Sequence, residues 1–89
     1  MSDQEPVEIP IEGVIDLHAF APRDVTSVVD EYLREAQRVG FVTVRLIHGR
    51  GKGVQRAAIQ RLLRNHPLVA RFWDAPEAHL GATVVELRQ

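Results

Sequence analysis

Hydrophobic residues recur every second position in some segments of the chain and every third or fourth position in others. The first spacing predicts a strand and the second a helix, so each change of spacing marks a new element. The segment from Val14 to His18 alternates, with Ile15 and Leu17 on one face, as is typical of a strand. From Val25 onward the pattern predicts an amphipathic helix that stops at Gly40. The hydrophobic positions that define this helix are Val25, Val28, Val29, Leu33, Ala36 and Val39.

The second half of the chain predicts one more helix between strands. Phe41 to His48 is β-branched and apolar, so we expect a strand there, and a second helix ends before Pro67, which cannot continue it. The apolar face of this helix is predicted to hold Ala58, Ile59, Leu62, Leu63 and His66, and the polar face Arg56, Gln60, Arg61 and Arg64. Val69–Trp73 and Ala82–Leu87 are predicted as two further strands.

The order β-α-β-α-β-β predicts an α/β fold, a two-layer sandwich with a mixed four-stranded sheet. Two helices cannot cover both faces of such a sheet, so we expect them mainly on one face. Residues 13–89 are expected to form the domain, and residues 1–12, which carry four acids and two prolines, a mobile acidic tail.

The composition excludes several classes of protein. With 45% hydrophobic and 26% charged residues the chain is too apolar for wholesale disorder, and no apolar run approaches the roughly 20 residues of a membrane span. There is no cysteine, which excludes disulfide scaffolds and thiolate chemistry. We expect a cytoplasmic protein that does not bind membranes.

The charge is unevenly distributed although the net charge is only −1. The run from Gln37 to Trp73 contains eight basic residues and no acid, whereas the remainder holds all 12 acids. This asymmetry predicts one basic surface that binds anions, although a solvated arginine-rich helix face is the simpler explanation.

A glycine-rich turn falls between the second predicted strand and the second helix. Gly49, Gly51 and Gly53 permit close approach of a ligand to the backbone, and Arg50 and Lys52 add positive charge beside a helix N-terminus. The spacing matches neither the Walker loop nor the Rossmann fingerprint, so we expect no free nucleotide. A phosphate of a polymer is favoured over a mere tight connection.

Three polar residues at strand ends are candidate catalytic groups. Asp16 and His18 lie two apart on the first strand, and His48 ends the second; if these strands are parallel, their ends meet at one edge of the sheet. A carboxylate can orient an imidazole for proton transfer, and a second imidazole can supply acid catalysis or stabilise a pentavalent phosphorus. The same trio could hold a divalent metal such as Mg or Mn, with Asp16 the first ligand, or simply cap the loops.

Other polar and aromatic residues have simpler explanations beside functional ones. His66 is expected to end the second helix and His79 to lie at the surface. One of Phe72 and Trp73 should be in the core; an exposed Trp73 would be able to stack on a base, although a packed ring is favoured. Thr83 could donate its hydroxyl to a phosphate or serve only as a good strand former.

Three motifs in order resemble the Smr (small MutS-related) domain family over residues 13–87. The stretch from Ile15 to His18 is similar to its LDLH opening, His48 to Gly53 to its HGxGxG segment, and Gly81 to Leu87 to its closing GATVVEL strand. Ala19 stands where the family usually has glycine, so we expect the turn after His18 to differ. The resemblance implies a stand-alone domain with a fold like the C-terminal domain of translation initiation factor three.

The resemblance also implies nucleic-acid binding and, in several members, cleavage by a nicking endonuclease, with possible protein partners in DNA repair or translation. It assigns Asp16 and His18 to cleavage, and His48 with the glycines that follow it to contact with the nucleic acid. The residues expected to bind DNA or RNA are Gly49, Arg50, Gly51, Lys52, Gly53, Arg56, Arg61, Arg64 and Thr83. A non-catalytic DNA- or RNA-binding module, or a ribosome-associated adaptor, is the alternative.

Overall fold

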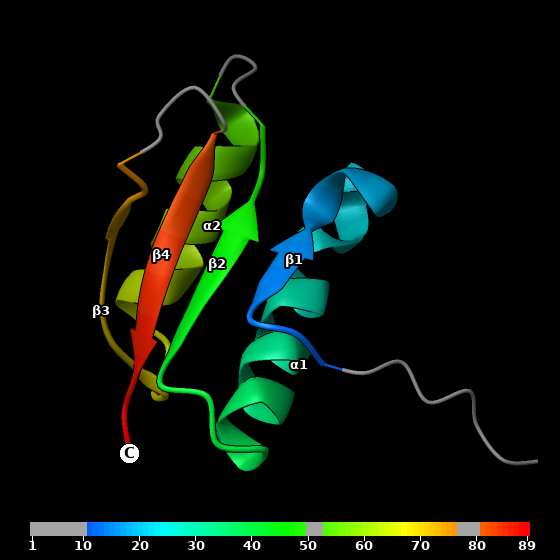
Figure 1. Cartoon of the computed structure of the whole chain (residues 1–89). Helices are drawn as coiled ribbons and strands as arrows, with labels where there is room; N and C mark the ends of the chain where they lie inside the picture. The colour runs from blue at the N-terminus through cyan, green and yellow to red at the C-terminus, as the bar shows by residue number, and fades with distance from the viewer. Residues whose placement is uncertain (1–10, 50–52, 77–80) are drawn as a thin grey trace, which may run out of the picture.

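The computed structural model describes residues 11–49, 53–76 and 81–89. Its four strands form one sheet in the order β1-β2-β4-β3, and Figure 1 shows both helices packed on the same side of it. The elements are β1 (Val14–Asp16), α1 (Val25–Arg38), β2 (Thr43–Ile47), α2 (Val54–Arg64), β3 (Val69–Asp74) and β4 (Ala82–Leu87). The predicted mixed sheet with two helices is therefore confirmed.

The pairing of the strands brings three chain segments to one edge of the sheet. β1 pairs with β2 in parallel, with Asp16 opposite Ile47, because α1 carries the chain back across the sheet between them. β4 runs antiparallel to β2 and places Ala82 beside Ile47. The last residues of β1 and β2 and the first of β4 therefore lie next to one another.

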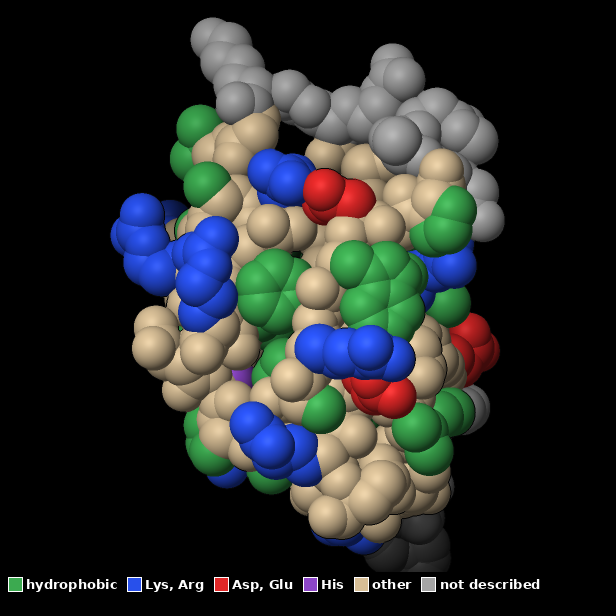
Figure 2. All heavy atoms as spheres, turned by 90° about the vertical axis from the view of Figure 1, so that its left-hand side faces the viewer, with side chains coloured by type: hydrophobic (Ala, Val, Ile, Leu, Met, Phe, Trp, Pro, Cys, Tyr) green, Lys and Arg blue, Asp and Glu red, His purple; other side chains and the backbone are tan. Residues whose placement is uncertain are grey.

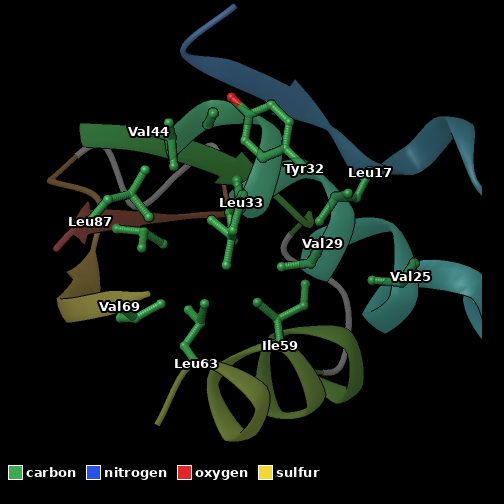
Figure 3. Packing of buried hydrophobic residues seen from close by; sticks show 13 residues of the cluster. Leu17, Val25, Val29, Tyr32, Leu33, Val44, Ile59, Leu63, Val69 and Leu87 are labelled. Carbon is green, nitrogen blue, oxygen red and sulfur yellow. The ribbon is translucent and has the colours of Figure 1, made fainter. Parts of the chain in front are cut away.

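The core lies between the sheet and the two helices (Figure 3). Its fully buried side chains come from both layers, for example Val29 and Leu33 of α1, Leu46 of β2, Ile59 of α2 and Val85 of β4. The three- and four-residue spacing of α1 predicted this face correctly, except that Val39, just beyond the helix, is 50% exposed. Burial of these side chains fixes both helices on the sheet and so fixes the strand ends relative to α2.

β1 is shorter than the sequence predicted because Asp16 ends it. The Asp16 carboxylate accepts a hydrogen bond from the backbone N–H of His18 and caps a 3₁₀ turn formed by Leu17–Ala19. Ala19 therefore needs no positive φ, and within the described residues only glycines have one. Alanine is therefore tolerated at this position without backbone strain.

The amino-terminal boundary of the packed chain lies slightly earlier than expected. Residues 1–10 of the predicted tail lie outside the described residues, but Ile11 packs against the core. The hydroxyl of Tyr32 donates to the carbonyl of Glu12, and burial raises the pKa of Tyr32 to about 12. Ile11 and Glu12 therefore belong to the domain.

Of the helices that the structure describes, none combines the length and apolar character needed to cross a lipid bilayer.

Candidate functional site

Asp16 and His18 form an exposed carboxylate–imidazole pair. Asp16 Oδ1 lies 2.7 Å from His18 Nδ1 and 2.9 Å from the His18 backbone N. Since the carboxylate accepts, Nδ1 carries the proton, and the lone pair of a neutral His18 is on Nε2. The pKa of Asp16 lies below its ordinary value, mainly because the backbone N–H of His18 donates to it. Both side chains are more than 60% exposed, so the pair faces solvent.

The His18 ring lies directly against Gly49, the first glycine of the glycine-rich segment. A β-carbon built on Gly49 would lie 2.6 Å from His18 Nε2 and 3.2 Å from its Cε1. The predicted meeting of the acid–imidazole pair with the first glycine of the turn is therefore present. Arg50, Gly51 and Lys52 lie outside the described residues.

His48 follows β2 but is buried rather than presented to solvent. Its Nδ1 lies 3.0 Å from the carbonyl oxygen of Gly49, and its Nε2 lies 2.9 Å from Thr83 Oγ1. A carbonyl can only accept, so Nδ1 donates to Gly49 and Nε2 accepts from the Thr83 hydroxyl. Burial lowers the pKa of His48 below its usual 6.5 and so favours this neutral form.

Thr83 is fully buried, and its hydroxyl has two partners. It donates to His48 and accepts from Gln60 Nε2 at 3.1 Å. Thr83 and His48 therefore offer no free polar atom to a phosphate in this conformation, contrary to the direct contact we expected for each. We assign them the task of holding the turn that Gly49 begins.

Gln60 is the residue of this site that the sequence analysis missed. We placed it on the polar face of the second helix, but it is only 8% exposed and its amide also donates to Asp74 Oδ1 at 3.1 Å. The spacing of residues along a helix does not show whether a glutamine side chain is buried or exposed to solvent. Only the pairing of Asp74 with Thr83 across the sheet puts both acceptors under α2.

A cleft of about 290 Å³ opens at this edge of the sheet, beside the turn. Its lining includes Gly49, Gly53 and Gly81 together with His48, Arg56 and Asp74. Gly53 adopts φ +84° as the residue before α2, and the first turn of this helix holds no acid. The unpaired N–H groups of that turn and the helix dipole favour an anion here. The Gly49 amide is not available, because it donates to the carbonyl of Gly81 at 2.9 Å.

Folding neutralises part of the basic run that the sequence displays. Arg56 makes two hydrogen bonds to Asp74, at 2.9 and 2.7 Å, and Arg38 and Arg71 pair with Glu35 and Glu86. Figure 2 accordingly shows basic side chains spread over the β3 side of the molecule, some with acidic groups beside them. The predicted division into a basic surface and an acidic remainder is thus only partly kept. Among the described residues, the exposed Arg61 and Arg64 of α2 have no acidic partner.

His66 follows α2 and continues the predicted apolar face of this helix, so its burial agrees with that expectation. Its side chain is buried, with Nε2 2.7 Å from Asp30 Oδ1 on α1, and Nδ1 accepts from the backbone N of Leu68. The hydrogen bond from His66 is the main reason that the pKa of Asp30 is lowered. His66 therefore ties the two helices together, away from the cleft.

A protein-held divalent metal does not fit the described residues. No three His, Asp or Glu side chains come together within the ranges 11–49, 53–76 and 81–89. Asp16 and His18 supply two ligand types, and His18 Nδ1 already donates to the carboxylate.

The chain matches the sequence model of the Smr domain over residues 15–88, which includes all of the site. It belongs to the Smr domain family. Its solved relatives include the Smr domain of Thermus thermophilus MutS2, 40% identical, with a TM-score of 0.79 over 85% of this chain and 98% of that one. YdaL, a stand-alone small MutS-related protein from Escherichia coli, has the same fold, with a TM-score of 0.79 at 23% identity over 93% of this chain and 70% of YdaL.

Curated relatives of this Smr domain are much longer proteins. It is 43% identical over 83 residues to endonuclease MutS2 of Caldicellulosiruptor saccharolyticus and 42% identical over 76 residues to endonuclease MutS2 of Thermus thermophilus. These matches cover 91% and 83% of this chain but 10% of each relative. The chain therefore spans about a tenth of the length of these relatives, and their activity reaches it only as a proposal.

Proposed function

We propose that this Smr domain binds structured DNA or RNA and cleaves a phosphodiester bond. The observation that carries the proposal is the exposed His18 imidazole, fixed by Asp16 through Nδ1 and lying with Nε2 against Gly49. An exposed imidazole that a carboxylate orients, and whose Nε2 keeps its lone pair, suits proton transfer. The name of these relatives, endonuclease MutS2, supports the same reaction class.

In the proposed reaction, His18 Nε2 removes a proton from the attacking oxygen, which is water or, on RNA, the neighbouring 2′-hydroxyl. That oxygen bonds to phosphorus, the bond to the leaving sugar oxygen breaks, and the leaving oxygen takes up a proton. Asp16 holds the ring orientation and stabilises the imidazolium that forms. General base catalysis of this kind contributes roughly 10²- to 10⁴-fold in rate.

Gly53 and the first turn of α2 are proposed to hold the phosphate in the cleft, beside Arg56, whose charge is largely compensated by Asp74. His48 and Thr83 act as positioning residues, since they fix the Gly49 backbone from below. Arg61 and Arg64 continue the positive charge along α2 and are proposed to contact the polymer backbone. Arg50, Gly51 and Lys52 keep their predicted role as phosphate contacts, outside the described residues.

A nicking assay on branched DNA and on structured RNA tests the proposal. We expect Asp16→Asn and His18→Ala to reduce cleavage at least about 100-fold while binding, measured by fluorescence anisotropy, stays within threefold. Asp24→Asn is a matched control, because Asp24 is an exposed carboxylate whose side chain caps nothing. Unchanged cleavage by both site variants would contradict the assigned roles. Tight binding by the wild type without cleavage of any substrate would favour the non-catalytic binding module instead.

A further inference from the structure

Trp73 is a large aromatic side chain that the proposed reaction does not use and that folding leaves at the surface. It is 40% exposed, whereas its neighbour Phe72 packs against the core. Trp73 pairs with Val84 of β4, so it lies on the face of the sheet opposite the helices. The expectation that one of these two rings is in the core is confirmed for Phe72.

A cationic, flat group lies beside the exposed indole. The Arg71 guanidinium carbon is 5.3 Å from the centre of the Trp73 ring. Arg71 is also paired with Glu86, so its charge is largely compensated and it is poorly suited to hold a phosphate. A neutral, planar ligand fits this pair better than an anion, because it can place its face on the indole and its edge near the guanidinium.

The position of Trp73 relates it to the cleft. Asp74, the next residue, lines the cleft. The backbone N–H of Ala75 donates a hydrogen bond to the carbonyl of Ala82 on β4. Ala82 pairs with Ile47 of β2, and Ile47 pairs with Asp16 of β1. Three strand spacings and two residues along β3 separate Trp73 from Asp16, about 16 Å between α-carbons on the same face. A nucleic-acid strand with a 3.4 Å rise covers this distance in about five nucleotides, and an extended strand in fewer.

We infer that Trp73, with Arg71 beside it, is a stacking site for an unpaired nucleobase a few nucleotides from the cleaved phosphate. The inference rests on the proposed function and adds a preference for substrates with a single-stranded segment next to the cut. Stacking on an aromatic ring needs an exposed base face, which a continuous duplex does not offer. The site therefore distinguishes branched or looped substrates from plain duplex.

Trp73 is the only tryptophan in the chain, so its emission reports this site alone. We would titrate the full chain with a ~10-nucleotide oligothymidylate and, separately, with a blunt duplex, and record tryptophan emission and the anisotropy of an end-labelled oligonucleotide in parallel. We expect the single strand to quench the emission strongly and the duplex to leave it nearly unchanged. Trp73→Ala should weaken single-strand binding about tenfold, or ~1.4 kcal/mol, with duplex binding within twofold.

Two further variants separate stacking from a general loss of structure. Trp73→Phe keeps an aromatic face and should retain single-strand affinity within about threefold. Val42→Ala removes a side chain of similar exposure, 49%, next to the opposite end of β2 and should match the wild type. Circular dichroism melting of each variant would show that the fold is intact.

The possible outcomes separate this inference from the proposed function. Single-strand binding with unchanged emission, and equal affinity of Trp73→Ala, would overturn the stacking site and leave the proposed function standing. If no oligonucleotide raises the anisotropy, both fail. An emission change that follows protein concentration alone would assign this face to a second copy of the chain and would also overturn the inference.

Discussion

Gly49 and His18 are in contact although 30 residues of chain separate them, and the contact leaves no room for a side chain on Gly49. A β-carbon there would lie 2.6 Å from His18 Nε2, and Gly49 also has φ +88°. The two motifs that the sequence displays separately are thus one packed unit. The nitrogen that contacts the turn is the one we propose as the general base.

Gly49→Ala should displace the His18 ring and reduce cleavage strongly, with a loss of stability of about 1–2 kcal/mol from the left-handed backbone. The matched control is Gly40→Ala, since Gly40 has φ +101° but nothing within 4 Å of an added β-carbon. Both variants should lose similar stability in urea unfolding, and only Gly49→Ala should lose activity. Equal activity in the two would show that the contact with His18 is unimportant.

Asp16 has two tasks that different substitutions separate. Asp16→Asn keeps a side-chain oxygen for the backbone N–H of His18 but loses the charge beside the ring, whereas Asp16→Ala loses both. We expect both variants to lose cleavage, and only Asp16→Ala to lower the thermal midpoint noticeably, because the cap of the 3₁₀ turn is gone. Full cleavage by Asp16→Asn would mean that the carboxylate serves only as a cap.

Thr83→Val tests the buried network under the turn. The substitution leaves His48 Nε2 without a donor and one proton of Gln60 without an acceptor, so stability should fall by about 1–3 kcal/mol for each group left unpaired. Thr83→Ser keeps the hydroxyl and should lose less. Chemical denaturation gives the comparison, and a Thr83→Val variant as stable as Thr83→Ser would rule out a structural role for the hydroxyl.

Stability should fall as the pH drops below about 6.5, in part because of His48. Its pKa in the folded protein is below its usual 6.5, mainly through burial, so the unfolded chain binds more protons in that range. The contribution of His48 to the free energy of unfolding is fully present above pH 6.5, and it is lost as the pH falls through the pKa of His48 in the folded protein. His48→Gln should reduce the difference between unfolding free energies at pH 7 and at pH 5.5. NMR titration of the His48 Cε1 proton in the wild type would give the pKa directly, and a value above 6.5 would contradict the burial argument.

Arg61 and Arg64 of α2, which have no acidic partner among the described residues, should determine part of the salt dependence of nucleic-acid binding. Removing both with Arg61→Ala and Arg64→Ala should reduce the slope of log affinity against log salt by roughly two, if each contacts one phosphate. Arg34→Ala with Arg38→Ala is the matched control, because it removes two charges from α1 that are paired with Asp30 and Glu35. An unchanged slope in the double variant would move the nucleic-acid contact away from this helix.

Local pattern was enough to predict the elements and their order, since a strand or an amphipathic helix is encoded in the spacing of neighbouring side chains. The predicted bounds of β4, Ala82–Leu87, are those observed, and the motifs around His18 and Gly49 are visible in the sequence itself. Their meeting at one edge was also predictable, because parallel strands bring their ends together. The physical basis of these successes is short-range: each depends on residues close in sequence or on one strand pairing.

Burial and pairing across the sheet decided the remainder. Gln60 and Thr83 are polar residues in patterns that equally suit solvent, and tertiary contacts alone gave them, and His66 on the apolar face, their hydrogen-bond partners. Ion pairs likewise neutralise part of the positive charge of the acid-free run, because Asp74 pairs with Arg56 and Glu86 pairs with Arg71. Such partners lie 14 to 36 residues apart along the chain, and a local pattern carries no information about which of them will meet.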